Sequence, residues 1–86
     1  MSIRDDIIDQ YPHDEFLFLD GFDDAVIGVA QVDEFYRVVY SQDKIINILI
    51  NRDEMSEEDA VDYYEFNIHH NYFGEKTPIF MENFHY

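Results

Sequence analysis

Hydrophobic and polar residues of this chain fall into short blocks, and the period of each block predicts its secondary structure. Residues 25–31 and 36–41 are rich in β-branched and aromatic side chains, so we expect two strands there, joined by a hairpin loop at 32–35. Residues 79–81 follow Pro78 and predict a short last strand, because proline is tolerated where a strand begins.

The N-terminal residues predict an amphipathic helix within residues 1–13, with Ser2 as its N-cap. Its apolar residues are expected to share one face: Ile3, Ile7, Ile8 and Tyr11. A compact apolar run follows at residues 16–19. The sequence Asp-Gly-Phe-Asp-Asp at 20–24 then predicts a turn in which Gly21 adopts a positive φ.

A second helix is predicted over residues 42–52, with Ser41 as its N-cap. Three of its apolar residues form one stripe: Ile45, Ile48 and Leu49. Ile46 and Ile50 form a second stripe beside the first. So wide an apolar arc indicates burial on two sides of the helix, or a surface kept for a partner.

A third helix begins at the strongest local signal in the chain. Ser56 is placed as its N-cap, and Asp59 occupies the capping-box position three residues later. The helix is expected to run to about Asn71, with Gly74 near its C-terminal stop. Its inner face is expected to hold the following residues: Ala60, Val61, Tyr64, Asn67, Ile68 and Asn71.

Together these elements predict a small α+β fold, in which short antiparallel strands pack against two or three helices. We expect a single domain over residues 1–86, with a flexible tail at 82–86. Apolar residues make up 47% of the chain and aromatic residues 17%, which is enough for one core despite a net charge of −15. The chain has no cysteine, which excludes disulfides, zinc-thiolate sites and cysteine nucleophiles.

The charge limits the partners that the chain can bind. A net charge of −15 opposes direct binding to nucleic acid or to an anionic membrane, and favours a basic protein. No apolar run reaches the length of a membrane span, and the first residues lack the basic flank and apolar core of a signal peptide. We therefore expect a cytoplasmic protein.

Several motifs are similar to those of a small family of acidic proteins encoded by bacteriophages and bacteria. They are DGFDDA at 20–25, RVVY at 37–40, MSEEDA at 55–60, YEFN at 64–67 and GEKTPIF at 74–80. The family has no established activity, so the resemblance implies a setting, the cytoplasm of a bacterial host, rather than a mechanism. Residues 69–73, His-His-Asn-Tyr-Phe, depart from the small residues that relatives have there.

The third helix carries the candidate site. A row of polar residues recurs at i, i+4, i+7 and i+11: Glu58, Asp62, Glu65 and His69. Carboxylates about 6 Å apart along a helix are able to imitate backbone phosphates, although a solvated polar face or a metal site fits the same spacing. Tyr63 and Phe66 flank this row, either packed under another segment or exposed as anchors for a partner.

Other chemistry is poorly supported. Asp20, Asp23 and Asp24 suggest calcium, but their spacing fits a capped turn better than an EF-hand loop. His69 and His70 are adjacent, so on a helix they point about 100° apart and cannot share a metal ion. No serine elbow or glycine-rich phosphate loop is present, and five Lys and Arg residues are too few for a nuclease to hold DNA. We expect neither a metal site nor a cofactor.

The favoured function is that of a non-enzymatic acidic protein-binding module, in its sharpest form a phage-type inhibitor that mimics DNA. Such a module would occupy the basic nucleic-acid-binding surface of a host protein. Two alternatives stay open. One is a small metal-binding or enzymatic accessory protein that uses the carboxylates of the 20–24 turn. The other is a structural protein that forms a homo-oligomer through Ile46 and Ile50.

Overall fold

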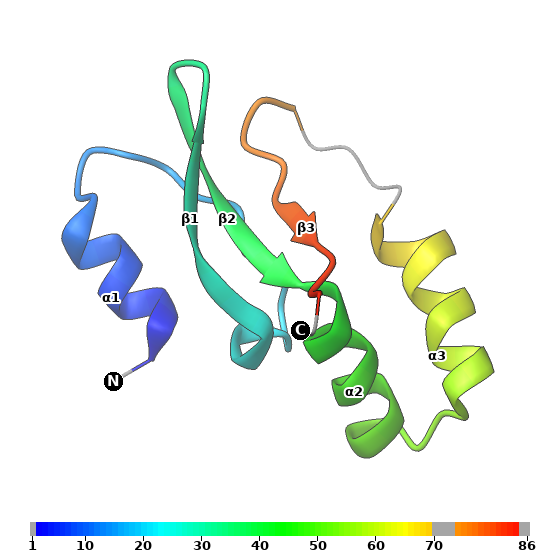
Figure 1. Ribbon diagram of the computed structural model, residues 1–86. Coiled ribbons are helices and arrows are strands. Elements are labelled where there is room, and N and C mark those ends of the chain that lie inside the picture. The colour runs from blue at the N-terminus through cyan, green and yellow to red at the C-terminus, as the bar shows by residue number, and fades with distance from the viewer. Residues whose placement is uncertain (1, 70–73, 85–86) are drawn as a thin grey trace.

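A three-stranded sheet lies between an N-terminal helix and a pair of helices in the computed structural model, which describes residues 2–69 and 74–84 (Figure 1). Strand β1 (Val26–Val32) pairs antiparallel with β2 (Phe35–Ser41) across a tight turn, in which Asp33 has a φ of 56°. The predicted hairpin is confirmed, and so is the α+β class.

The third strand runs in the opposite sense to the one expected. β3 (Ile79–Met81) pairs with β2 in parallel, so the expectation of antiparallel strands holds for β1 and β2 and is wrong for β3. The reason is the connection between them. The chain leaves β2 through helices α2 (Gln42–Arg52) and α3 (Glu57–Tyr64), and a crossover of this kind brings the chain back to the end of the sheet where β2 began.

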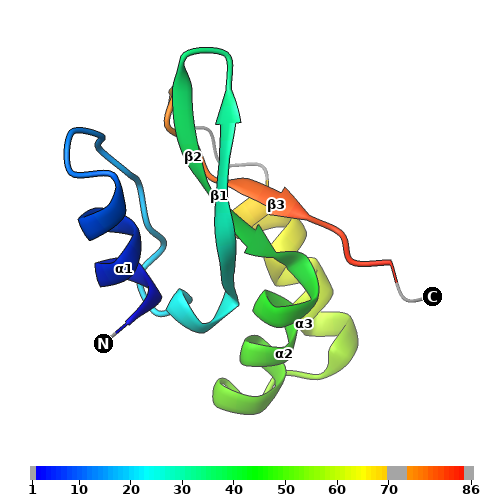
Figure 2. The same cartoon turned by 60° about the vertical axis from the view of Figure 1, so that its left-hand side comes forward.

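Helix α1 (Ile3–Gln10) begins at the predicted cap, where the Ser2 hydroxyl accepts the Asp5 N–H at 3.2 Å. It lies at one edge of the fold, apart from α2 and α3 (Figure 2). Of the apolar residues expected on one face, Ile7 is buried, whereas Ile3 and Ile8 are exposed.

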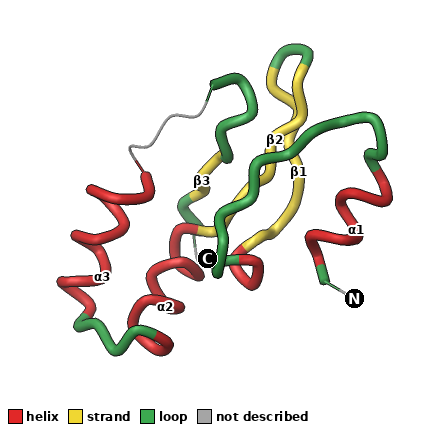
Figure 3. Tube along the Cα trace, turned by 180° about the vertical axis from the view of Figure 1, so that it is seen from behind, coloured by secondary structure: helices red, strands yellow, loops and turns green. Residues whose placement is uncertain are grey.

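The segment that follows α1 crosses the sheet as an irregular strip (Figure 3). Its backbone is held at residue 19, because the Leu19 N–H donates to the buried Tyr40 hydroxyl at 2.7 Å. The predicted turn comes next, and Gly21 has the expected positive φ of 86°. A short 3₁₀ turn, η1 (Asp23–Ala25), leads into β1.

The core joins the sheet to α2 and α3 through large side chains. Its buried residues are Ile7, Ala25, Val26, Val38, Tyr40, Ile45, Leu49, Ala60, Tyr64 and Ile68. Phe80 of β3 links the two halves, since its ring centroid lies 6.0 Å from that of Tyr40 and 5.8 Å from that of Tyr64. Burying such side chains contributes about 1.5–3 kcal/mol each.

Helix α3 continues without a break into a π-helical turn, η2 (Glu65–His69). The predicted end at about Asn71 lies outside the described residues. Ala60, Tyr64 and Ile68 are buried as expected, but Val61 and Asn67, placed on the same face by the sequence pattern, are exposed. The predicted tail at 82–86 stays a prediction, and residues 85 and 86 lie outside the described part of the chain.

Candidate protein-binding surface on the third helix

The surface of α3 is dense in carboxylates because its start is built by capping chemistry. The Ser56 hydroxyl accepts the Asp59 N–H at 3.1 Å, and acidic residues in the first turn favour the positive end of the helix. Four carboxylates on its first two turns are exposed: Glu57, Glu58, Asp59 and Asp62. The sequence has no Lys or Arg between Asp53 and Glu75 to offset them.

The π-helical turn divides the predicted polar row. Glu58 and Asp62 remain exposed on α3, four residues apart, while Glu65 and His69 belong to η2. A π-helical turn holds more residues than an α-helical one, so side chains after Tyr64 are rotated away from the α-helical row. Glu65 is half-buried, and the row does not continue as one line of charge.

His69 is exposed, but its ring contacts two aromatic residues on the side of the sheet. Its Nδ1 lies 3.0 Å from the Tyr64 hydroxyl oxygen, and its ring centroid lies 6.0 Å from that of Phe80. Burial raises the pKa of Tyr64 well above its usual range, and the nearby carboxylates of Glu65 and Glu82 raise it further. The Tyr64 hydroxyl therefore stays protonated at neutral pH.

The two flanking aromatic residues are exposed. Phe66 is 77% exposed and Tyr63 is 42% exposed. Both line a shallow hollow of about 380 Å³, here called the Phe66 hollow. Its full lining is Met55, Asp59, Asp62, Tyr63, Phe66 and Asn67.

The Phe66 hollow brings together three of the six predicted site residues, Asp62, Tyr63 and Phe66. Glu58, Glu65 and His69 do not line it. Met55 and Asp59 line it but were not predicted as site residues, because the capping signal at 55–60 accounted for them fully. Met55 lies just before helix α3 and Asp59 lies in its first turn, and these positions are the sequence signal that could have placed both residues beside Tyr63.

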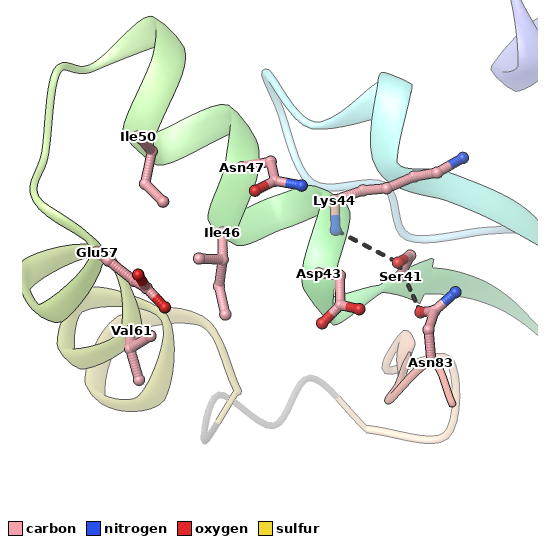
Figure 4. A pocket seen from close by; sticks show the side chains of 9 residues that line it. All are labelled: Ser41, Asp43, Lys44, Ile46, Asn47, Ile50, Glu57, Val61 and Asn83. Carbon is pink, nitrogen blue, oxygen red and sulfur yellow. Dashed lines mark hydrogen bonds between the residues drawn. The ribbon is translucent and has the colours of Figure 1, made fainter. Parts of the chain in front are cut away.

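A second depression, the α2/α3 groove, lies between α2 and α3. It encloses about 580 Å³, and Ile46 and Ile50 project from α2 toward Glu57 and Val61 of α3 (Figure 4). The second apolar stripe predicted on α2 is therefore only half-buried and lines an open groove. Val61, expected on the same helix face as Ala60 and Tyr64, is 37% exposed here.

Side-chain bonds fix one end of the α2/α3 groove. The buried Ser41 hydroxyl accepts the Lys44 N–H at 3.3 Å and donates to Asn83 Oδ1 at 2.8 Å (Figure 4). The Ser41 side chain thus caps α2 and also holds the residues that follow β3.

Most of the basic side chains are engaged by the chain itself. Arg4 pairs with Asp23 at 2.8 Å, and Arg52 pairs with Asp53 at 3.0 Å. Both guanidinium groups also stack on phenylalanine rings, and the Lys76 ammonium lies 5.0 Å from the ring centroid of Phe35. These contacts leave few cations to offset the exposed carboxylates of α3.

The carboxylates of the 20–24 turn were predicted to belong either to a capped turn or to a metal site, and two of them lie close to Arg4. Asp23 is directed to Arg4, and Asp20 lies 3.8 Å from the same guanidinium group. Within residues 2–69 and 74–84, no three His, Asp or Glu side chains are grouped so that they could hold a metal ion. Among the same residues, no helix has the length and apolar character needed to span a membrane.

Comparison of the chain with family models, with curated proteins and with solved structures finds no match.

Proposed function

We propose that this chain is a non-enzymatic binding module, whose α3 surface docks onto a basic protein. The observation that carries the proposal is the position of Phe66, which is 77% exposed and lines one hollow with two carboxylates, Asp59 and Asp62. An exposed aromatic ring ringed by acid has the composition of a protein-binding anchor, since aromatic hot spots combine with a charged rim.

Charge alone does not single out α3. Helix α1 also carries exposed carboxylates, among them Asp5 and Asp9, but its exposed apolar residues are aliphatic. The aromatic pair Tyr63 and Phe66 is what distinguishes the α3 surface. In the sharper form of the proposal, the α3 carboxylates take the place of phosphates on a nucleic-acid-binding protein of a bacterial host, in the host cytoplasm. The resemblance to phage and bacterial proteins supports this setting.

The proposal is tested by capture from a bacterial lysate on the immobilised full chain. The test variant, Glu58→Gln with Asp62→Asn, removes two charges spaced i, i+4 on α3. The matched control, Asp5→Asn with Asp9→Asn, removes two charges of the same spacing on α1. Exposed ion pairs contribute about 0.2–1 kcal/mol each, so the α3 variant should bind a captured protein roughly 2- to 30-fold more weakly.

Three outcomes would contradict the proposal. Equal loss in the α1 and α3 variants would mean that only net charge matters. Retention that is unchanged between about 50 mM and about 500 mM salt would exclude electrostatic docking. If the Phe66→Ser variant retained the captured protein as well as the parent chain does, Phe66 would not be an anchor for binding. The DNA-mimic form is tested separately: excess duplex DNA should release the captured protein, and failure to do so contradicts mimicry while leaving the binding module in place.

A further inference from the structure

The α2/α3 groove is a second surface, on the side of α3 away from the Phe66 hollow. The two depressions share no lining residue, because Glu57 and Val61 line the groove whereas Asp59, Asp62 and Phe66 line the hollow. A conclusion about the groove therefore does not rest on the function proposed above.

The floor of the groove is apolar, and its rim holds two carboxylates, one lysine and three neutral polar side chains. Ile46 and Ile50 are half-buried and Val61 is 37% exposed, so the three side chains leave aliphatic surface open to solvent. Glu57 lies beside Val61, and Asp43 lines the groove one turn before Ile46 (Figure 4). Lys44 also lines the groove, but its side chain extends away from Ile46 and Ile50 (Figure 4).

We propose that the α2/α3 groove binds an amphipathic segment of a basic protein. An apolar side chain of that segment rests on Ile46, Ile50 and Val61, and a flanking Lys or Arg side chain lies beside Glu57. Charge complementarity selects this occupant: an apolar floor beside Glu57, on a chain with a net charge of −15, matches a helical segment with one apolar and one basic face.

A second copy of the chain is a poorer match for the groove. Each copy carries a net charge of −15, so two copies repel each other. Three of the five basic side chains, Arg4, Arg52 and Lys76, are already held by carboxylates or aromatic rings of their own chain. A second copy therefore has few cations to place beside Glu57.

The probe is a synthetic helical peptide of leucine and lysine in amphipathic spacing, titrated into the ¹⁵N-labelled full chain. A peptide with serine in place of leucine keeps the same charge and serves as the control. We expect the leucine peptide to shift the amide signals of Ile46, Ile50 and Val61 most. Since burying one leucine side chain contributes enough for a 10- to 100-fold change in affinity, the serine peptide should bind about 10- to 100-fold more weakly.

Variants separate the groove from the Phe66 hollow. Val61 is partly exposed on the floor of the groove, so the Val61→Lys variant should keep the fold. The new lysine places a positive charge in the groove and should repel the lysines of the peptide. It should weaken binding of the leucine peptide at least about tenfold. Tyr63→Ser with Phe66→Ser, in the hollow, should leave that affinity within about twofold. Ile50→Ser, checked for folding by circular dichroism, is the second floor variant.

The proposal is overturned by any of three results. The serine peptide binds as tightly as the leucine peptide, the amide shifts centre on Tyr63 and Phe66, or Val61→Lys binds unchanged. Sedimentation of the chain alone tests whether a second copy of the chain occupies the groove. Dimers that Val61→Lys dissociates would assign the groove to a second copy and overturn the proposal, whereas a monomer at all concentrations supports it.

Discussion

The hydroxyl oxygen of Tyr64 and Nδ1 of His69 lie 3.0 Å apart, five residues along a helix that changes from α to π between them. An i to i+5 repeat is that of a π-helical turn, so the contact follows directly from the change in helix type. Tyr64 is fully buried and its ring packs edge-on against Phe80 of β3. The pair therefore attaches the end of the third helix to the sheet.

Removing the Tyr64 hydroxyl should destabilise the fold. We expect Tyr64→Phe to lower the free energy of unfolding by about 0.5–1.5 kcal/mol, the usual net value of one hydrogen bond. Urea denaturation followed by circular dichroism measures the change. Tyr63→Phe makes the same chemical change one residue earlier on an exposed ring, and should stay within about 0.5 kcal/mol of the parent. Equal effects from both variants would contradict a specific role for the Tyr64–His69 contact.

Two buried tyrosines should make the protein sensitive to alkaline pH. Burial raises the pKa of Tyr40 and of Tyr64 above the ordinary value of 10.0. The unfolded chain releases these protons near pH 10 while the folded chain keeps them. The contribution of these two tyrosines to the free energy of unfolding is therefore fully present below about pH 10. It falls as the pH rises above that value, by up to about 1.4 kcal/mol per pH unit for each tyrosine.

The alkaline effect is measured by urea denaturation across the pH range from about 8 to about 11, which spans the ordinary tyrosine pKa. Tyr40→Phe and Tyr64→Phe should each make the decline shallower, because each removes one linked proton. A double variant that loses stability as steeply as the parent would show that other groups, or charge repulsion alone, cause the decline.

The sequence predicted the starts of the helices well, because each start depends on a capping residue and its near neighbours. Ser2, Ser41 and Ser56 cap their helices as expected, because capping is decided within a few residues. The direction of β3 was not predictable in this way. A three-residue strand carries no local sign of its partner, and its parallel pairing is set by the path of the chain through α2 and α3.

The candidate site was predicted only in part for a related reason. The row of Glu58, Asp62, Glu65 and His69 assumed one helical period, and the π-helical turn changes that period after Tyr64. Nothing in the local sequence announces this turn. Burial of Ile68 and the contact between Tyr64 and His69 accompany it, and both involve tertiary packing.

The contact between Leu19 and Tyr40 makes a prediction about the irregular segment on the sheet. Tyr40→Phe leaves the Leu19 N–H without its acceptor, so we expect a loss of about 1–3 kcal/mol in the free energy of unfolding. Hydrogen exchange gives the local measure, because the Leu19 amide should lose its protection in the variant. Tyr36→Phe, on the same strand, should leave that amide protected. Protection that survives in Tyr40→Phe would mean that another group holds Leu19.

The bond between Ser41 and Asn83 tests whether the residues after β3 are held to the fold. Ser41 is fully buried, and its hydroxyl serves both Lys44 and Asn83, so Ser41→Ala should cost about 1–3 kcal/mol. A double-mutant cycle with Asn83→Ala isolates the bond from the helix cap. We expect a coupling energy of about 0.5–1.5 kcal/mol, measured by urea denaturation. Coupling near zero would instead favour the flexible tail predicted for residues 82–86, and would leave the end of the α2/α3 groove open.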